Sequence, residues 1–307
     1  MRTESDYAEV AEEIRRVRPD IIALQEIGSI PAARRVLGEG YQVAFETRCL
    51  RNEHKCDADN DDIYIAIAFR NELAGRVTVF QVDSLAINHT DECGNTRPVR
   101  GGVGVKLDIG GRPTWVLSVH MKAACRTNNS QSRTPLDCAT QRTQFDALKT
   151  WILGRPTGDA VIIAGDFNRA LLNSKDRIRR SIFSALSNNV RLLPEHRTCW
   201  SGYRFNWSDL KSEARKNNPE FEASNLEPWI YSPERHRDID FFMAINTAPG
   251  IRFESDQLQP PRLRFEKPRR ILKKCDGTVI TTRPRAAITF GDAYPSDHCL
   301  IVLKVNF

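Results

Sequence analysis

The chain has 307 residues, of which 40% are hydrophobic and 27% charged, a globular composition that argues against a disordered protein. No run of about 18 or more apolar residues occurs, which excludes a transmembrane helix. The net charge of +6 is mild, and it fits an anionic partner without establishing one.

The first predicted element is an amphipathic helix from Tyr7 to Val17, because apolar residues recur there at helical spacing; Pro19 ends it. Residues 21–27 predict a buried strand, and residues 121–138 a polar loop. Further helices are expected at 31–37, 140–153 and about 174–188, and further strands at 41–47, 63–69, 76–83, 102–108, 114–120, 161–167, 238–245 and 299–305.

These elements follow one another without a linker-like break, which favours a single mixed α/β domain over residues 1–307. Two stretches depart from the pattern. Residues 200–236 are polar with interspersed aromatic residues and predict a long loop or insertion. Residues 262–285 form a basic segment.

The eight cysteines bear on the compartment of the protein. None are spaced as CxxC, which argues against a zinc ribbon or a thioredoxin-like redox site. The even number suggests disulfides and an oxidising compartment, but the polar start MRTESDYAEV shows no signal peptide.

Acids, amides and histidines stand at the ends of several predicted strands, where a rigid sheet can hold loop side chains in place. A single strand-end acid is often only solvated, and a single Asp-x-Asn is often only a turn. The ordered set is less expected by chance: Glu26 in LQEI, His120 in LSVH, Asp166 and Asn168 in AGDFN, Asp240 in DID, and Asp297 and His298 in PSDH.

The motifs LQE, SVH, GDFN, DIDF and SDH, in this order, resemble the endonuclease/exonuclease/phosphatase superfamily over about residues 8–307. The run HMKAAC, followed by Cys138, Gln141 and GDFNR, is most similar to a bacterial, often exported, deoxyribonuclease-like branch. The resemblance implies a four-layer α/β sandwich, in which two mixed β-sheets pack face to face between outer helices.

The resemblance also implies roles for the acids and histidines. Glu26 matches a metal-ligand position and Asp297 a second one; hard carboxylate oxygens suit Mg²⁺, with Mn²⁺ or Ca²⁺ as alternatives. His298 would act as general base or polarise the phosphate, with Asp240 orienting its ring. His120 would be the acid for the leaving oxygen.

The remaining candidates would handle the phosphate. Asp166 and Asn168 lie two apart at a strand end, so their side chains are expected on one side, where they could position water and phosphate. Arg100 matches a phosphate-contacting arginine of the family. Lys122 is a second phosphate candidate, for which a solvated surface lysine is the alternative.

The start of the chain departs from the family pattern. Members open with a strand carrying an Asn, whereas here the first helix begins almost at Met1, so this strand is missing. We expect a shortened start, which would also have removed a signal peptide and would make the protein secreted or periplasmic; otherwise it is cytoplasmic. If the chain is complete, its activity is in doubt.

Two cysteine pairs stand out. Cys125 and Cys138 flank one polar loop directly after the His120 strand, and we expect a disulfide between them. Cys49 and Cys56 are the next candidates. The alternative for each is a small buried hydrophobic residue.

The basic segment 262–285 bears on the substrate, since it holds nine basic and two acidic residues. It is either a solvated face or a track for a phosphate backbone. We predict a monomeric, Mg²⁺-dependent phosphodiesterase, a nuclease of low sequence specificity acting on nucleic acid. The alternatives are a phosphatase or phospholipase C-type hydrolase on inositol phosphates or sphingomyelin, and a catalytically inactive nucleic-acid-binding or interaction protein.

Overall fold

The computed structural model describes residues 4–51, 56–57, 63–128, 135–186, 190–193, 240–247, 251–253, 264–266, 271–273, 279–281, 287–289 and 303–305. The chain divides into two compact units. The larger unit comprises Val10–His196, Asp238–Asp256 and Leu300–Phe307, and the smaller one Met1–Glu9, Arg197–Arg237 and Gln257–Cys299. The single domain expected from the sequence stays a prediction.

Two sheets form the larger unit. The first is three-stranded and antiparallel in the order β1-β3-β2, with β1 at Ile21–Ile27, β2 at Tyr41–Phe45 and β3 at Tyr64–Arg70. The second has six strands in the order β10-β11-β9-β8-β7-β4. They are β4 (Thr78–Gln81), β7 (Gly102–Ile109), β8 (Arg112–His120), β9 (Ala160–Asp166), β10 (Val190–Leu193) and β11 (Asp240–Ile245).

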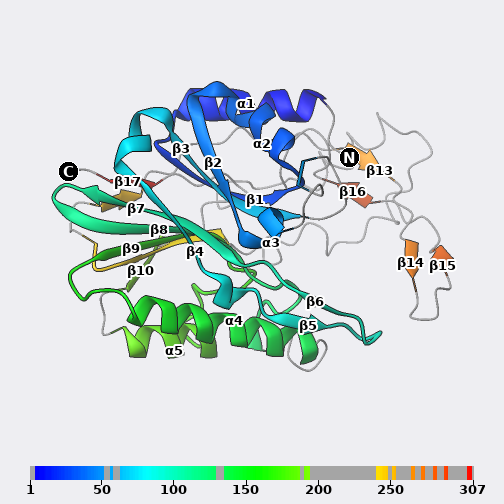
Figure 1. The fold of residues 1–307 in the computed structure, drawn as a ribbon. Helices are drawn as coiled ribbons and strands as arrows, with labels where there is room; N and C mark the ends of the chain where they lie inside the picture. Colours follow the sequence, from blue (N-terminus) through cyan, green and yellow to red (C-terminus); the bar gives the residue numbers. More distant parts are fainter. Residues whose placement is uncertain are drawn as a thin grey trace, which may run out of the picture. The chain divides into compact units, whose positions relative to one another are not determined.

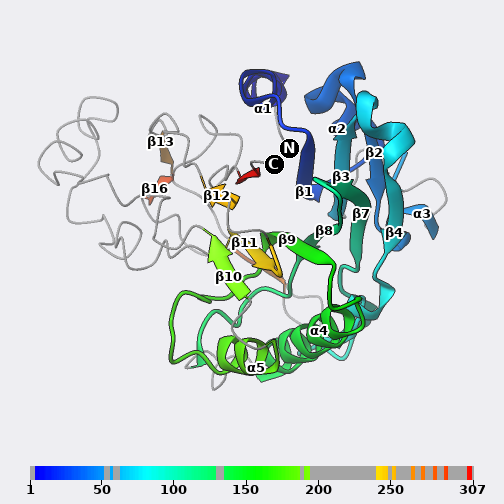
Figure 2. The same ribbon diagram turned by 90° about the vertical axis from the view of Figure 1, so that its left-hand side faces the viewer.

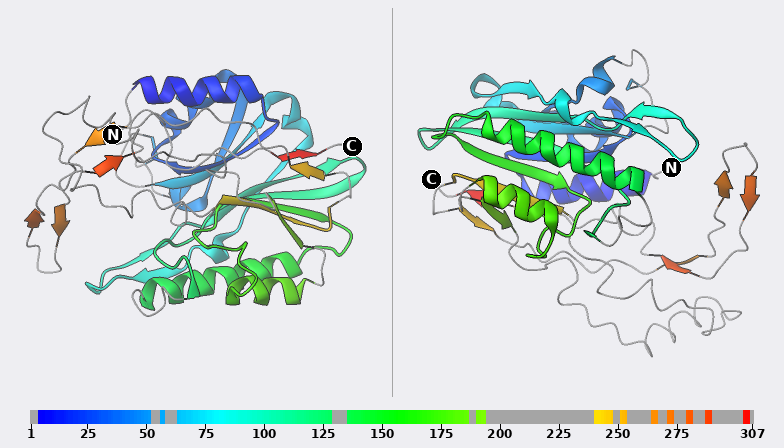
Figure 3. Two further views of the ribbon diagram at one scale, coloured as in Figure 1. Left: turned by 180° about the vertical axis from the view of Figure 1, so that it is seen from behind. Right: turned by 90° about the horizontal axis from the view of Figure 1, so that it is seen from below.

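Helices cover both outer faces of the paired sheets. Helix α1 (Glu4–Val17) and helix α2 (Ile30–Leu37) lie on the three-stranded sheet, and α4 (Pro135–Leu153) and α5 (Arg177–Ala185) lie on the six-stranded one (Figure 1). Figure 2 shows the layers from the side, and the view from below in Figure 3 shows α4 and α5 next to each other across the sheet. This arrangement confirms the predicted four-layer α/β sandwich.

Two apolar cores hold the layers together. Between the sheets, Ile65 and Ile67 of β3 pack with Val103 and Val105 of β7. A second core lies beneath the helices and includes Phe145, Leu148, Ile163, Ile182 and Phe241. Strands β8 and β9 are parallel, and α4 connects them; a parallel pair requires such a crossover.

Smaller elements complete the described residues. They are the helix α3 (Thr47–Arg51), the 3₁₀ helices η1 (Gly38–Gly40), η2 (Asn71–Arg76) and η3 (Asp83–Leu85), and the hairpin of β5 (Asn88–Thr90) and β6 (Thr96–Pro98). Strand β12 (Ile251–Phe253) pairs with β17 (Leu303–Val305) in the larger unit. In the smaller unit β13 (Arg264–Glu266) pairs with β16 (Ala287–Thr289), and β14 (Ile271–Lys273) with β15 (Val279–Thr281).

Some element boundaries differ from the sequence prediction. The helix expected from residue 140 begins at Pro135, because proline is well accommodated in a first helical turn. Cys138 therefore lies in α4 and not in the preceding loop. The strand expected at 41–47 ends at Phe45, because α3 begins at Thr47. Among the described residues, no helix is long and apolar enough to cross a membrane.

Candidate active site

Glu26 projects from a distortion near the end of β1. The pairing of β1 with β3 shifts register between Leu24 and Ile27, a bulge of the kind that redirects a side chain. Glu26 has a positive φ of 55°, which is unusual for a residue with a side chain, and it is exposed. Gln25, next to it, donates a hydrogen bond to Ser118 of β8 (3.2 Å), which links the two sheets beside the bulge.

His120 and Asp166 end the parallel strands β8 and β9 in the same register. Both are buried, each 4% exposed, and His120 Nε2 lies 3.5 Å from Asp166 Oδ2. Gly165 makes this approach of the strands possible. Its φ is 139°, and a Cβ atom there would lie 2.0 Å from the carbonyl oxygen of Val119.

Asp166 and Asn168 contact each other through a turn. The Asn168 backbone N–H donates to Asp166 Oδ1 (2.6 Å), and its side-chain amide donates to Asp166 Oδ2 (2.9 Å) and to the Met121 carbonyl (3.1 Å). We expected strand alternation to place the two side chains together. Strand β9 instead ends at Asp166, and a left-handed backbone at Asn168 (φ 49°) brings the amide back to the carboxylate.

Arg100 precedes β7 and lies between the predicted acidic residues. Its Nε donates to the His120 carbonyl (3.3 Å), and its charge interacts with Glu46, Glu26 and Asp166. Burial lowers the pKa of the Arg100 guanidinium, and these three carboxylates oppose that effect. The guanidinium keeps a positive charge beside the strand ends where an anionic group would be bound.

Lys122 is held in an ion pair. Its Nζ lies 2.5 Å from Asp137 Oδ1 on α4, and His89 Nε2 lies 3.3 Å from the same oxygen. His89 also contacts the Thr140 hydroxyl (2.9 Å), and burial, together with the Lys122 charge, lowers the pKa of His89. Lys122 is therefore not the solvated surface lysine that the sequence left as an alternative.

The last motif residues are only partly described. The backbone of Asp240 begins β11 and pairs in register with Asp166, so it lies at the same strand end. Asp297 and His298 lie outside the described residues. The side-chain contacts proposed for these three residues stay predictions.

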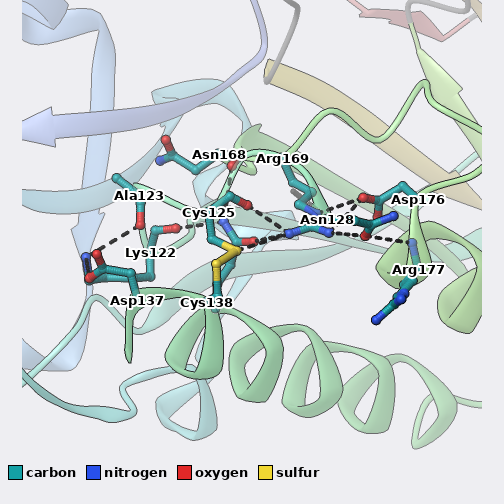
Figure 4. The surroundings of a disulfide bond; sticks show 11 residues. Lys122, Ala123, Cys125, Asn128, Asp137, Cys138, Asn168, Arg169, Asp176 and Arg177 are labelled. Carbon is teal, nitrogen blue, oxygen red and sulfur yellow. Dashed lines mark hydrogen bonds and ion pairs between the residues drawn. A yellow bond between two sulfur atoms is a disulfide. The ribbon is translucent and has the colours of Figure 1, made fainter. Parts of the chain in front are cut away.

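A buried network joins the His120 and Asp166 loops (Figure 4). Cys125 and Cys138 form a disulfide, as do Cys49 and Cys56, so both expected pairs are present. Arg169 lies beside the first disulfide and is 4% exposed. Its guanidinium contacts Asp176 (2.8 Å), Cys125 O (2.9 Å) and Asn128 Oδ1 (2.7 Å).

Sequence reasoning missed three polar residues that support this site. Glu46 accepts the Gly101 backbone N–H, Gln141 donates to the Lys122 and Asn168 carbonyls, and Arg169 anchors the network just described. Glu46 lies near the end of the strand expected at 41–47, as Glu26 does in the strand at 21–27, and this position was an available signal. Gln141 and Arg169 stand in the runs that carry the family resemblance but were given no role, because their partners are remote in sequence.

The described carboxylates suit a metal ion that takes only a few ligands from the protein. Within the described ranges no three His, Cys, Asp or Glu side chains are grouped to hold a metal ion. Mg²⁺ keeps several waters and often takes only one or two carboxylates. The exposed carboxylate of Glu26 fits that requirement, and Asp297, the second predicted ligand, is not among the described residues.

Several solved structures are similar to this chain. The human Nocturnin catalytic domain is 20% identical, with 84% of this chain and 80% of that chain covered and a TM-score of 0.47. A humanized D. rerio TDP2 is 15% identical (92% and 89% covered, TM-score 0.43). An endonuclease/exonuclease/phosphatase from Bacteroides vulgatus is 13% identical (92% and 87% covered, TM-score 0.44).

A comparison with curated protein sequences gives no match. A sequence profile of the Endonuclease/Exonuclease/phosphatase family, in contrast, matches residues 2–215, well over half of the chain. This range contains the LQE, SVH and GDFN motifs, and His120 and Asp166 of the last two lie at neighbouring strand ends. The chain therefore belongs to the endonuclease/exonuclease/phosphatase family of phosphoester hydrolases.

Proposed function

We propose that this protein is a divalent-metal-dependent phosphodiesterase that cleaves nucleic acid with little sequence specificity. The observation that carries the proposal is the convergence of an imidazole, a carboxylate and a guanidinium. His120 and Asp166 lie 3.5 Å apart, and Arg100 donates to the His120 carbonyl. These are the groups that proton transfer and phosphoryl charge stabilisation require.

The geometry suggests a division of roles. His120, whose Nε2 lies 3.5 Å from Asp166 Oδ2, would be the acid that donates a proton to the leaving oxygen. Arg100 would bind the phosphoryl oxygens, and Asn168 keeps Asp166 oriented. Glu26 and Asp297 would hold a Mg²⁺ ion, which when bound stabilises phosphoryl charge and acidifies a bound water.

Two further residues are assigned from the family motifs. We assign His298 as the general base and Asp240 as the carboxylate that orients its ring. The in-register pairing of Asp240 with Asp166 supports a place for Asp240 at this strand end. Lys122 is a weaker phosphate ligand than Arg100, because Asp137 already neutralises its ammonium group.

Nucleic acid is the preferred substrate because of the basic segment 262–285, whose nine basic residues suit a phosphate backbone. Such contacts give affinity without reading bases, which accounts for the low sequence specificity proposed. We expect the protein to act as a monomer within one catalytic domain.

Plasmid nicking tests the proposal. Supercoiled plasmid with Mg²⁺ should be nicked, and EDTA should stop the reaction. Asp166→Asn should lower the rate at least about 100-fold, as expected for a group that supports proton transfer. Asp159→Asn is the matched control. Asp159 is also a buried carboxylate, lies just before β9 and accepts a hydrogen bond from Trp115 Nε1 (2.8 Å). It should leave the rate within about twofold.

The other outcomes separate the alternatives. Intact plasmid with Mg²⁺ and with Mn²⁺ would contradict the nuclease. Phosphate release from inositol phosphates, or phosphocholine release from sphingomyelin, would identify the phosphatase or phospholipase C-type hydrolase. Plasmid binding without cleavage would identify an inactive binding protein.

We also propose that the protein matures in an oxidising compartment, secreted or periplasmic. Cys49, Cys56, Cys93, Cys125 and Cys138 are all disulfide-bonded, and such bonds persist mainly outside the cytosol.

A further inference from the structure

Glu46 is a fully buried carboxylate for which the reaction just proposed has no role. It follows β2 directly and has 0% exposure. Its Oε2 accepts the Gly101 backbone N–H at 2.6 Å, and its Oε1 accepts the Ile65 N–H (3.3 Å) and an Arg48 N–H (3.4 Å). The carboxylate therefore joins β2, β3 and the segment that enters β7.

Keeping this group ionised is costly. Burial raises the pKa of Glu46, although Arg48, the two backbone N–H groups and Arg100 all act in the opposite direction. The free-energy cost of removing a charge from water is rarely offset in full by its partners in the protein. A buried carboxylate is therefore poorly explained by a contribution to stability alone. A role in the site would account for its presence better.

The amide that Glu46 binds most closely belongs to the residue directly after Arg100. The contact is made by the Gly101 backbone N–H at 2.6 Å, and a Cβ atom there would lie at an ordinary van der Waals distance (3.4 Å) from Glu46 Oε2, so it does not depend on glycine. The Arg100 carbonyl accepts a hydrogen bond from Gln144 (3.3 Å), and its side chain donates to the His120 carbonyl (3.3 Å). Arg100 is thus fixed through the peptide on its C-terminal side and through its own guanidinium.

We propose that Glu46 is a positioning residue that orients Arg100 toward the phosphate. It touches no reacting atom itself and acts through the Gly101 N–H and through its charge. The role in catalysis rests on the proposed phosphodiesterase function, whereas the orientation of Arg100 by Glu46 does not.

A double-mutant cycle in the nicking assay tests the coupling. Glu46→Gln should lower kcat/KM about 10-fold, because small displacements of a catalytic group cost one to two orders of magnitude. Arg100→Lys should cost about 100-fold. If Glu46 acts through Arg100, the double variant should match Arg100→Lys within about twofold, whereas independent effects would multiply to about 1000-fold. Multiplied effects, or an unchanged Glu46→Gln rate, would overturn the proposal.

The side-chain Nε–H signal of Arg100 in a ¹⁵N spectrum gives a readout that needs no activity. The signal, identified by its loss in Arg100→Lys, should be distinct in the wild type and should move to the position of solvent-exposed arginines in Glu46→Gln. The control Asp159→Asn should leave it in place. An unchanged signal in Glu46→Gln overturns the proposal even if the wild type cleaves nothing, and an inactive wild type with a shifted signal overturns only the proposed function.

Glu46→Asp serves as the second variant should Glu46→Gln not fold. It keeps the charge on a shorter arm and should give smaller changes of rate and signal in the same direction. If neither variant folds, Glu46 is a stability residue and the proposal is wrong.

Discussion

Arg169 holds the two active-site loops together, and replacing it by methionine should strongly destabilise the protein. Methionine keeps most of the apolar stem but removes the guanidinium. The change leaves Asp176, which is 2% exposed, without its cation, and it removes the Arg169 donor from Cys125 O and from Asn128 Oδ1, of which Asn128 Oδ1 keeps the Arg177 backbone N–H (3.3 Å).

The expected loss of unfolding free energy in Arg169→Met depends on which contacts of Asp176 remain. Removing one partner of a buried ion pair costs about 3–5 kcal/mol. Asp176 still caps α5 by accepting the Ile178 and Arg179 N–H groups, so its charge is not left wholly unsatisfied. We therefore expect the unfolding free energy to fall by about 3 kcal/mol, the lower end of this range. Adding Asp176→Asn to Arg169→Met should recover at least about 1 kcal/mol, because no uncompensated charge is then buried.

Urea unfolding followed by circular dichroism measures the unfolding free energy of each variant. The variant and the wild type are compared provided that their m-values are equal. Arg179→Met is the control. Arg179 donates to the carbonyls of Leu171 and Leu172 but is only half-buried and pairs with no described acid, so about 1 kcal/mol is expected. A loss below about 1 kcal/mol for Arg169→Met, or equal losses for the two variants, would refute the reasoning.

Three further predictions concern backbone, charge and disulfides. Gly165→Ala should lower the melting temperature sharply and reduce activity, because its Cβ would lie 2.0 Å from the Val119 carbonyl, whereas Gly158→Ala, with open space around it, should be nearly neutral. The folded state holds the Glu46 proton at higher pH than the unfolded state, since its pKa is raised. The unfolding free energy of the wild type relative to Glu46→Gln should therefore fall as pH rises above about 4.5, by at most about 1.4 kcal/mol per pH unit; a rise would contradict this assignment. Thiol titration of the unreduced, denatured protein should find at most two reactive cysteines of the eight, because Cys93 is disulfide-bonded in addition to the pairs Cys49–Cys56 and Cys125–Cys138 and must engage a further cysteine; eight reactive thiols would argue against export.

The sequence predicted the strands well where apolar runs are long and ended by polar residues. The run before Asp166 and the run before His120 are examples, and both histidine and acid were expected at strand ends. Their in-register parallel pairing was not predicted, because hydrophobic pattern does not specify which strands become neighbours.

Supporting contacts were the part that could not be predicted. Glu46 and Gly101 are 55 residues apart, and Arg169 and Cys125 are 44 apart, so no local pattern connects them. The short β5–β6 hairpin was also missed, because its strands span three residues each and show no clear alternation. The start of α4 was placed too late because residues 121–138 were expected to form one polar loop, whereas α4 begins at Pro135.

The candidate site is divided between two sheets, since Glu26 comes from the three-stranded sheet and His120 and Asp166 from the six-stranded one. Their separation is therefore set by the thickness of the apolar layer between the sheets, where Ile65 of β3 and Val105 of β7 are fully buried. Loss of a methylene there alters packing locally. The apolar layer thus acts as a spacer, and natural variation in its side-chain volumes could retune catalysis in relatives whose motif residues are all identical.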